Sequence, residues 1–283
     1  MLNNNEKFIG CDKPYEEADI VIVGAPFDST TSFRPGARFG PKAMRCLSEG
    51  LETYSPGLHR DLTEENIFDA GDIELPIGDT EKTLRKIEDT ITKIIADDKF
   101  PFLLGGEHLV SLGAVRALAK KHPDLHIIHF DAHADLRDEY LGVKLSHASV
   151  MRRCWDLLGD GRIYQFGIRS GDREEFEWSK GHTELKLFNF QDLIEIVENL
   201  RGYPIYLTID LDILDPSVLP GTGTPEAGGV GYVELLREVR EVIGRSNLVG
   251  CDMVELAPAI DPSDMSTMVA GKLLREIILS ISR

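Results

Sequence analysis

The chain has 283 residues, of which 42% are hydrophobic and 28% charged, as in ordinary globular proteins with room for one extensive core. Its formal net charge of −17 and the lack of any long Lys/Arg run argue against nucleic-acid binding. So negative a field would attract a small cation to an acidic cleft, although on charge alone the simpler explanation is that it keeps the protein soluble.

Short apolar runs rich in Val and Ile alternate with longer amphipathic stretches. The runs are too short for helices and do not alternate polar with apolar residues, which is typical of strands buried on both faces of a parallel sheet. In chain order we predict strand 20–24, helix 80–98, strand 100–104, helix 109–121, strands 126–130 and 163–167, helix 190–200, strand 204–209, helix 232–243, strand 248–254 and helix 267–281. This alternation predicts an α/β fold with helices on both faces of the sheet, and residues 1–283 are predicted to form one domain.

Ligand-type side chains interrupt two of the apolar runs where the strands are predicted to end. The run IIHFDAHADL contains Asp131, His133 and Asp135, and LTIDLDILDP contains Asp210 and Asp212. If the strands continue through these residues, side chains two positions apart point to the same side. Sites in open parallel sheets form beyond the carboxyl ends of the strands, so we expect both groups at one edge.

A third segment, FLLGGEHL, places His108 just past a strand and a Gly-Gly turn. A lone histidine there is more often structural, and a DxD pair alone occurs by chance in acidic proteins. Together, however, four carboxylates and two imidazoles at three strand ends would repel one another and lose hydration unless cations lie among them. No Lys or Arg lies within either Asp run, so divalent metal is the simplest counter-charge. An oxygen-rich set with a minority of imidazole suits Mn²⁺, and Co²⁺, Ni²⁺ or Fe²⁺ could replace it.

These motifs, in this order, resemble the ureohydrolase family, which includes arginase, agmatinase and guanidinobutyrase. The resemblance runs from about Val21 to Leu274 and rests on GGEH, FDAHAD, SHAS, TIDLDILDPSVLPGTGTPEAGG and DMVELAP. It implies a three-layer α/β/α fold around a mostly parallel eight-stranded sheet, with two Mn²⁺ ions per chain. It also implies the ligands of each ion: His108, Asp131, Asp135 and Asp210 for one, and His133, Asp131, Asp210 and Asp212 for the other.

The same resemblance implies three catalytic residues, Asp135, His147 and Glu255. Asp135 would contact the nucleophilic water, His147 in KLSHAS would shuttle protons or act as general acid, and Glu255 would pair with the substrate guanidinium. Without the family motifs, His147 would be taken for a loop or core histidine and Glu255 for a helix cap. GGEH departs from the many members that have Asp in place of Glu107, but it retains His108.

Other family stretches are expected to shape the site. The glycine-rich stretch 221–229 lacks the Lys of a phosphate-binding loop and is expected to wall the site with backbone groups. We expect Arg34 and Arg38 to order loops and Asp215 to form a turn before Pro216.

The substrate prediction rests on the loop 136–147. This loop lacks the Asn and Thr residues with which arginases read an amino-acid head group, and together with FGIRSGDREEFEW it resembles bacterial agmatinases. We therefore predict that a small cationic guanidino compound, agmatine, is hydrolysed to putrescine and urea. Guanidinobutyrate and arginine are the alternative substrates within the family.

Two alternatives come from other functional classes. A cysteine-dependent amidino-group enzyme would use Cys154, because the preceding Arg152 and Arg153 could lower the pKa of its thiol. That mechanism leaves the carboxylate cluster unexplained. A non-catalytic polyamine or metal binder would be expected to have lost a ligand, and single-metal deacetylases of related fold do not need six.

Compartment and assembly are predicted from weaker signals. The four cysteines form no CxxC pair, so reduced thiols are expected. The N-terminal MLNNNEKF lacks the basic and apolar regions of a signal peptide, and no apolar run approaches the ~18 residues of a membrane span. We predict a cytoplasmic protein, and family resemblance implies a homo-oligomer, a trimer or hexamer.

Overall fold

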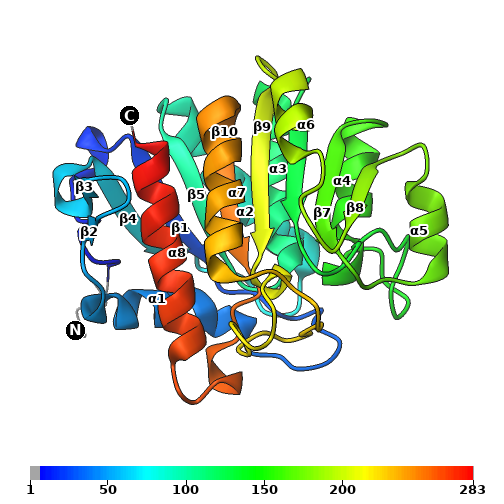
Figure 1. The fold of residues 1–283 in the computed structure, drawn as a ribbon, viewed down its shortest axis with the longest axis horizontal. Coiled ribbons are helices and arrows are strands. Elements are labelled where there is room, and N and C mark those ends of the chain that lie inside the picture. The colour runs from blue at the N-terminus through cyan, green and yellow to red at the C-terminus, as the bar shows by residue number, and fades with distance from the viewer. Residues whose placement is uncertain (1–6, 283) are drawn as a thin grey trace.

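The computed structural model describes residues 7–282. At its centre is an eight-stranded sheet with the order β4-β1-β5-β10-β9-β6-β7-β8, in which every neighbouring pair is parallel (Figure 1). The strands are β1 (Ile20–Ala25), β4 (Ile67–Asp72), β5 (Phe100–Gly105), β6 (His126–Phe130), β7 (Ile163–Ile168), β8 (Glu184–Leu187), β9 (Pro204–Asp210) and β10 (Asn247–Val254). A separate antiparallel hairpin pairs β2 (Tyr54–Ser55) with β3 (Arg60–Asp61).

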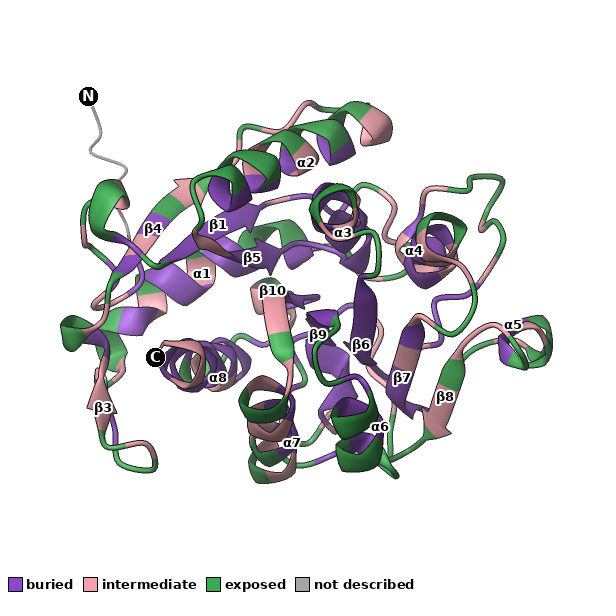
Figure 2. Ribbon diagram, turned by 90° about the horizontal axis from the view of Figure 1, so that it is seen from above, coloured by how far each residue is buried: buried purple, intermediate pink, exposed green. Residues whose placement is uncertain are grey.

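Two layers of helices cover the sheet (Figure 2). One face carries α2 (Thr80–Ala96), α3 (Ser111–Lys121) and α4 (Val150–Leu158). The opposite face carries α1 (Gly40–Leu47), α6 (Leu193–Asn199), α7 (Tyr232–Arg245) and α8 (Met265–Ile281). The short α5 (Arg173–Ser179) lies at the β8 edge. The predicted three-layer architecture is confirmed, and the main sheet is parallel throughout.

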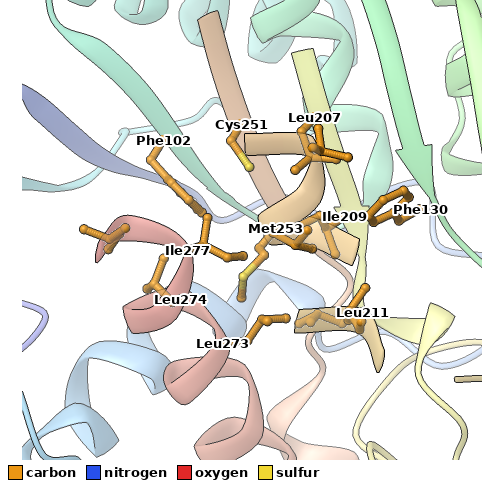
Figure 3. Close-up of a cluster of buried hydrophobic side chains, with 14 of the residues drawn as sticks. Phe102, Phe130, Leu207, Ile209, Leu211, Cys251, Met253, Leu273, Leu274 and Ile277 are labelled. Atoms are coloured by element: carbon orange, nitrogen blue, oxygen red, sulfur yellow. The ribbon is translucent and has the colours of Figure 1, made fainter. Parts of the chain in front are cut away.

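The apolar runs of the sequence form the middle of this sandwich. Every residue of β6 and β9 is buried, as expected for strands covered on both faces. Figure 3 shows one such contact, where Ile209 of β9 and Met253 of β10 meet Leu273 and Ile277 of α8. Burying side chains of this size stabilises the fold by about 1.5–3 kcal/mol each, so the strands that carry the site rest on a rigid base.

All six predicted strands and all five predicted helices are present, with ends shifted by a few residues. The prediction missed β4 and β8, the two edge strands, as well as the β2–β3 hairpin and the short helices α1, α4 and α5. The edge strands are only partly buried, so they carry no continuous apolar run.

The expectation that two strands continue through the Asp runs is wrong. β6 ends at Phe130, and β9 ends at Asp210, where the 3₁₀ turn η7 (Leu211–Ile213) begins. Asp210 Oδ1 accepts the backbone N–H of Asp212 at 2.9 Å, and Asp131 Oδ1 accepts that of His133 at 2.5 Å. The two-residue spacing therefore reflects a turn that each aspartate closes with its own side chain, not side chains that share one face of a strand.

Within residues 7–282, no helix combines the length and apolar character needed to span a bilayer. The expectation about a signal peptide concerns mainly residues 1–6, which lie outside the described range.

Candidate metal centre

Four neighbouring strands bring the predicted site residues together at the carboxyl end of the sheet. Phe130 of β6 pairs with Ile209 of β9, and Asp210 pairs with Val254 of β10, so Asp131 follows beside Asp210 and Glu255 lies one residue further along. β5, the other neighbour of β10, leads to His108 through a tight turn. Gly106 makes this turn possible, because a side chain there would overlap the backbone that follows β1.

His108 directs one ring nitrogen at three carboxylates. Its Nδ1 lies 3.0 Å from Asp131 Oδ2, 3.1 Å from Asp135 Oδ2 and 3.3 Å from Asp210 Oδ2. This nitrogen is buried and has no hydrogen-bond partner among the described residues. A lone pair facing three anionic oxygens is strongly unfavourable unless a proton or a metal ion lies between them.

The other ring nitrogen of His108 shows where its proton resides. Nε2 lies 2.9 Å from Thr208 Oγ1, and that hydroxyl donates to Asp252 Oδ1 at 2.6 Å. Because the hydroxyl proton is engaged by Asp252, Thr208 Oγ1 must accept a hydrogen bond from the Nε2–H of His108. In the neutral imidazole, Nδ1 is therefore unprotonated and free to bind a metal ion.

A second group lies beside the first and shares Asp131 with it. His133 Nδ1 lies 2.9 Å from Asp212 Oδ2 and 3.5 Å from Asp131 Oδ1. The ligand atoms of these three side chains lie within 4.8 Å of one another, close enough to surround one ion. All six predicted ligands thus come together as two adjacent groups.

The pKa shifts of these aspartates indicate that the cluster holds more negative charge than its own side chains can neutralise. Burial raises the pKa of Asp210 well above its ordinary value, and burial also raises that of Asp212. Burial alone would raise the pKa of Asp131, but the imidazoles of His129, His108 and His133 hold it well below its usual range. Two divalent ions would relieve the repulsion that otherwise forces protons onto this cluster, and the oxygen-rich donor set fits Mn²⁺.

Two of the predicted catalytic carboxylates lie on unusual backbone. Asp135 has a φ of 54° and Glu255 a φ of 66°, in the left-handed region that residues with a side chain seldom adopt. Such conformations cost on the order of 1–3 kcal/mol and persist where the surrounding structure demands them. Here both turn a carboxylate toward the same cavity.

The Glu255 side chain is held by a hydrogen bond from the backbone of His108. Its Oε1 accepts the backbone N–H of His108 at 2.8 Å. Burial raises the pKa of Glu255 well above its ordinary value, and the nearby Glu107 adds to the effect. A cation bound at this carboxylate would restore its charge, so the position suits a guanidinium group.

His147 opens the 3₁₀ turn η6 (His147–Ser149) at the rim of the site. Its Nε2 lies 3.3 Å from Ser32 Oγ, and its backbone N–H donates to Thr30 Oγ1 at 3.0 Å. Burial lowers its pKa below the usual value, so the ring is neutral at pH 7. The Thr30 hydroxyl in turn donates to Glu107, which the sequence had marked as a departure from the family.

These residues line one cavity of about 220 Å³. The predicted site residues in its wall are His108, His133, Asp135, His147, Asp210 and Glu255. Residues that the sequence had not singled out include Ser32, Arg137, Tyr140, Glu175 and Thr224. A cavity of this size suits a small molecule.

His129 is the site residue that sequence reasoning overlooked most plainly. It is fully buried at the penultimate position of β6, and its Nε2 lies 2.7 Å from Asp131 Oδ2. The signal was present, because a histidine two residues before Asp131 in an otherwise apolar strand needs a polar partner.

The secondary expectations about loops hold. Arg34 donates to the carbonyls of Thr222 and Gly223, and so ties the glycine-rich stretch to the loop after β1. Arg38 pairs with Asp28. Asp215 accepts backbone N–H groups from the turn that follows it and from the end of the glycine-rich stretch.

Cys154 does not have the environment of a reactive thiol. It is fully buried in α4, and burial raises the pKa of its thiol to about 12. The arginines before it are otherwise engaged, since Arg152 stacks on Trp178 at 3.8 Å and Arg153 pairs with acidic neighbours. A thiolate mechanism at Cys154 is therefore not supported.

Comparison with known proteins agrees with this geometry. The sequence model of the arginase family matches residues 18–280. An agmatinase from Bacillus cereus is 49% identical over 276 residues, which cover 96% of this chain and 95% of that protein. The crystal structure of agmatine ureohydrolase from Thermoplasma volcanium has a TM-score of 0.89 at 36% identity, covering 98% of this chain and 94% of the other.

A more distant relative is the mitochondrial guanidino acid hydrolase of Homo sapiens. It is 35% identical over 281 residues, covering 95% of this chain and 80% of that protein. With a matching family model over most of its length and relatives this similar, the chain belongs to the arginase family.

Proposed function

We propose that this chain is a binuclear manganese hydrolase that cleaves agmatine to putrescine and urea. The observation that carries the proposal is His108 Nδ1, which is unprotonated in the neutral ring and faces three carboxylates, beside a second group that shares Asp131. The similarity to agmatinases over nearly the whole chain supports the choice of reaction.

In this proposal one Mn²⁺ would be held by His108, Asp131, Asp135 and Asp210, and the other by His133, Asp131, Asp210 and Asp212. When bound, the paired ions supply a water of lowered pKa as the nucleophile. Hydrolysis would form a C–O bond between water and the guanidinium carbon and break the C–N bond to the amine, which would leave with a proton as urea is released.

The protein residues bind the substrate and move the proton. Glu255 pairs with the guanidinium through the oxygen that His108 leaves free. Asp135, which lines the cavity, would accept the proton of the nucleophile. His147 then carries a proton toward the leaving amine. Because burial lowers its pKa, His147 enters the reaction neutral, which favours a shuttle over a resident general acid.

The wall of the cavity favours a cationic tail on the substrate. Among the described residues of the wall, Arg137 carries the guanidinium that would best suit a carboxylate tail, as in guanidinobutyrate. Its guanidinium, however, is engaged by Asp172 and lies 3.5 Å from Glu175 Oε2, so its charge is already compensated. Glu175 itself lines the cavity as a buried carboxylate.

Urea release from a panel of guanidino compounds tests the proposal, with metal content determined on the same preparation. We expect agmatine to be the preferred substrate, and we expect chelation to abolish activity until Mn²⁺ is restored. Faster release from arginine or guanidinobutyrate would overturn the substrate, and full activity without transition metal would overturn the mechanism.

Three expectations stay predictions. They are the homo-oligomeric state (trimer or hexamer), the cytoplasmic location and the single domain over residues 1–283. Light scattering on the purified protein tests the first.

A further inference from the structure

Beneath the proposed metal ligands, His129 and Gln165 form a fully buried polar pair. They are direct partners in the register of β6 and β7, and both side chains are shielded from solvent. His129 also approaches the shared carboxylate closely enough that His108, His129, Asp131 and Asp135 together resemble a four-ligand metal group. Whether His129 is a ligand or a donor depends on which of its nitrogens carries the proton.

The contacts of Gln165 settle the orientation of its amide. The Nε2 atom lies 2.7 Å from the carbonyl oxygen of Ala134, which can only accept a hydrogen bond. On the other side, Oε1 accepts the hydroxyl proton of Thr183 at 3.1 Å. The Ala134 contact requires the nitrogen of the amide to face the strand end, and the oxygen therefore faces Thr183, whose hydroxyl can donate to it.

The second N–H of this amide fixes the tautomer of His129. Gln165 Nε2 lies 3.0 Å from His129 Nδ1, so the imidazole must accept there and Nδ1 carries no proton. The ring proton then resides on Nε2, which lies 2.7 Å from Asp131 Oδ2. His129 is thus a hydrogen-bond donor to Asp131, and a nitrogen that carries a proton cannot bind a metal ion.

We propose that Gln165 and His129 act as positioning residues that hold the Asp131 carboxylate in the orientation needed to bridge two metal ions. Asp131 is fixed at both oxygens, because Oδ2 accepts from His129 and Oδ1 accepts the backbone N–H of His133. Each oxygen keeps one further acceptor direction, and these lie on the sides of His108 and His133. The inference rests on the proposed binuclear site and adds how its shared ligand is oriented.

The test is Mn²⁺ affinity of the full-length protein, measured by the electron paramagnetic resonance of free Mn²⁺ during titration. His129→Phe removes the donor, and Gln165→Met removes the group that selects the tautomer. We expect each to weaken Mn²⁺ binding about 10–100-fold. His129→Gln can place an amide N–H near Asp131 and should recover most of the affinity.

A matched control is available on the same strand. His126 is also a buried histidine of β6, but it lies at the opposite end and bonds to the Asp124 carbonyl at 2.9 Å. His126→Phe should leave Mn²⁺ affinity unchanged. Wild-type Mn²⁺ affinity in a folded His129→Phe or Gln165→Met variant would overturn the inference, as would equal loss in His126→Phe. If His129→Phe does not fold, Gln165→Met carries the test.

The tautomer provides a readout that does not depend on activity. In Zn²⁺-loaded protein labelled with ¹⁵N-histidine, His129 should appear as the Nε2–H form, and Gln165→Met should lose that preference. An Nδ1–H form in the wild type would refute the inference. If the variants bind Mn²⁺ as expected but the wild type does not hydrolyse agmatine, only the proposed function is refuted. If the wild type is active and both variants bind Mn²⁺ as tightly as it does, only the role of His129 and Gln165 is refuted.

Discussion

Removing the hydroxyl of Thr208 tests the proton assignment on which the metal centre depends. Thr208→Val keeps the shape of the side chain but leaves the buried Nε2–H of His108 without an acceptor. Asp252 loses one donor but keeps the hydroxyl of Tyr206. One lost hydrogen bond costs about 1 kcal/mol and an orphaned buried N–H about 1–3 kcal/mol, so we expect a loss of about 2–4 kcal/mol in the free energy of unfolding.

Thermal unfolding of the metal-free protein measures this loss. At roughly 2 °C per kcal/mol for a chain of this size, Tm should fall by about 4–8 °C. Mn²⁺ affinity should also fall about 10–100-fold, because the proton of His108 is then free to move to the nitrogen that faces the metal.

Thr222→Val is the matched control. Thr222 is buried to the same degree as Thr208, but its hydroxyl has no hydrogen-bond partner among the described residues. The same substitution there should change stability by less than about 0.5 kcal/mol or stabilise the fold. If Thr208→Val unfolds no earlier than Thr222→Val and binds Mn²⁺ as tightly as the wild type, the assigned tautomer of His108 is wrong.

Three further predictions concern the chemistry. Glu255→Gln keeps the acceptor for the His108 backbone but loses the charge, so we expect urea release to fall by the equivalent of about 2–5 kcal/mol with unchanged metal content; loss of metal would instead make Glu255 a structural residue. His147→Gln should lower kcat about 10²–10⁴-fold with metal retained, and normal turnover would exclude the shuttle. Cys154→Ala should keep full activity, and iodoacetamide at pH 8 should spare Cys154, whose pKa of about 12 leaves almost no thiolate below pH 10; inactivation traced to Cys154 would revive the thiol mechanism.

The sequence predicted the central strands well because they are buried on both faces. Every residue of β6 and β9 is buried, and most of their side chains are apolar, so their composition distinguishes them from amphipathic helices and polar loops. β8, with the sequence ELKL, lies at an edge and is mostly accessible to solvent, so burial imposes no pattern on it. α4 contains buried arginine and cysteine, and its nine residues are too few for a clear periodic signal.

Residue type and spacing were enough to propose the six ligand positions, but not to predict the backbone geometry around them. Spacing by two suggested strands, whereas the side chains of Asp131 and Asp210 close turns. The partners of the ligands were hidden for a different reason. Thr208 lies on β9 and Gln165 on β7, whereas the histidines that they contact lie after β5 and in β6, and only the arrangement of the sheet brings them together. Long-range register of this kind leaves no local trace in the sequence.

The hydrogen bonds of Thr208 and Gln165 fix the tautomers of His108 and His129 in opposite ways. Thr208 accepts the proton of His108 on the side away from the carboxylates, so the nitrogen that faces them is left bare. Gln165 occupies the bare nitrogen of His129, so the proton is forced toward Asp131. One histidine is thereby suited to bind a metal ion and the other to donate a hydrogen bond, although the two rings lie only 5.1 Å apart beside the same carboxylate. Residue type and proximity cannot distinguish such roles. The two roles are distinguished by following each chain of hydrogen bonds away from the site to a group that can only accept. These groups are the Ala134 carbonyl for His129 and the Asp252 carboxylate for His108.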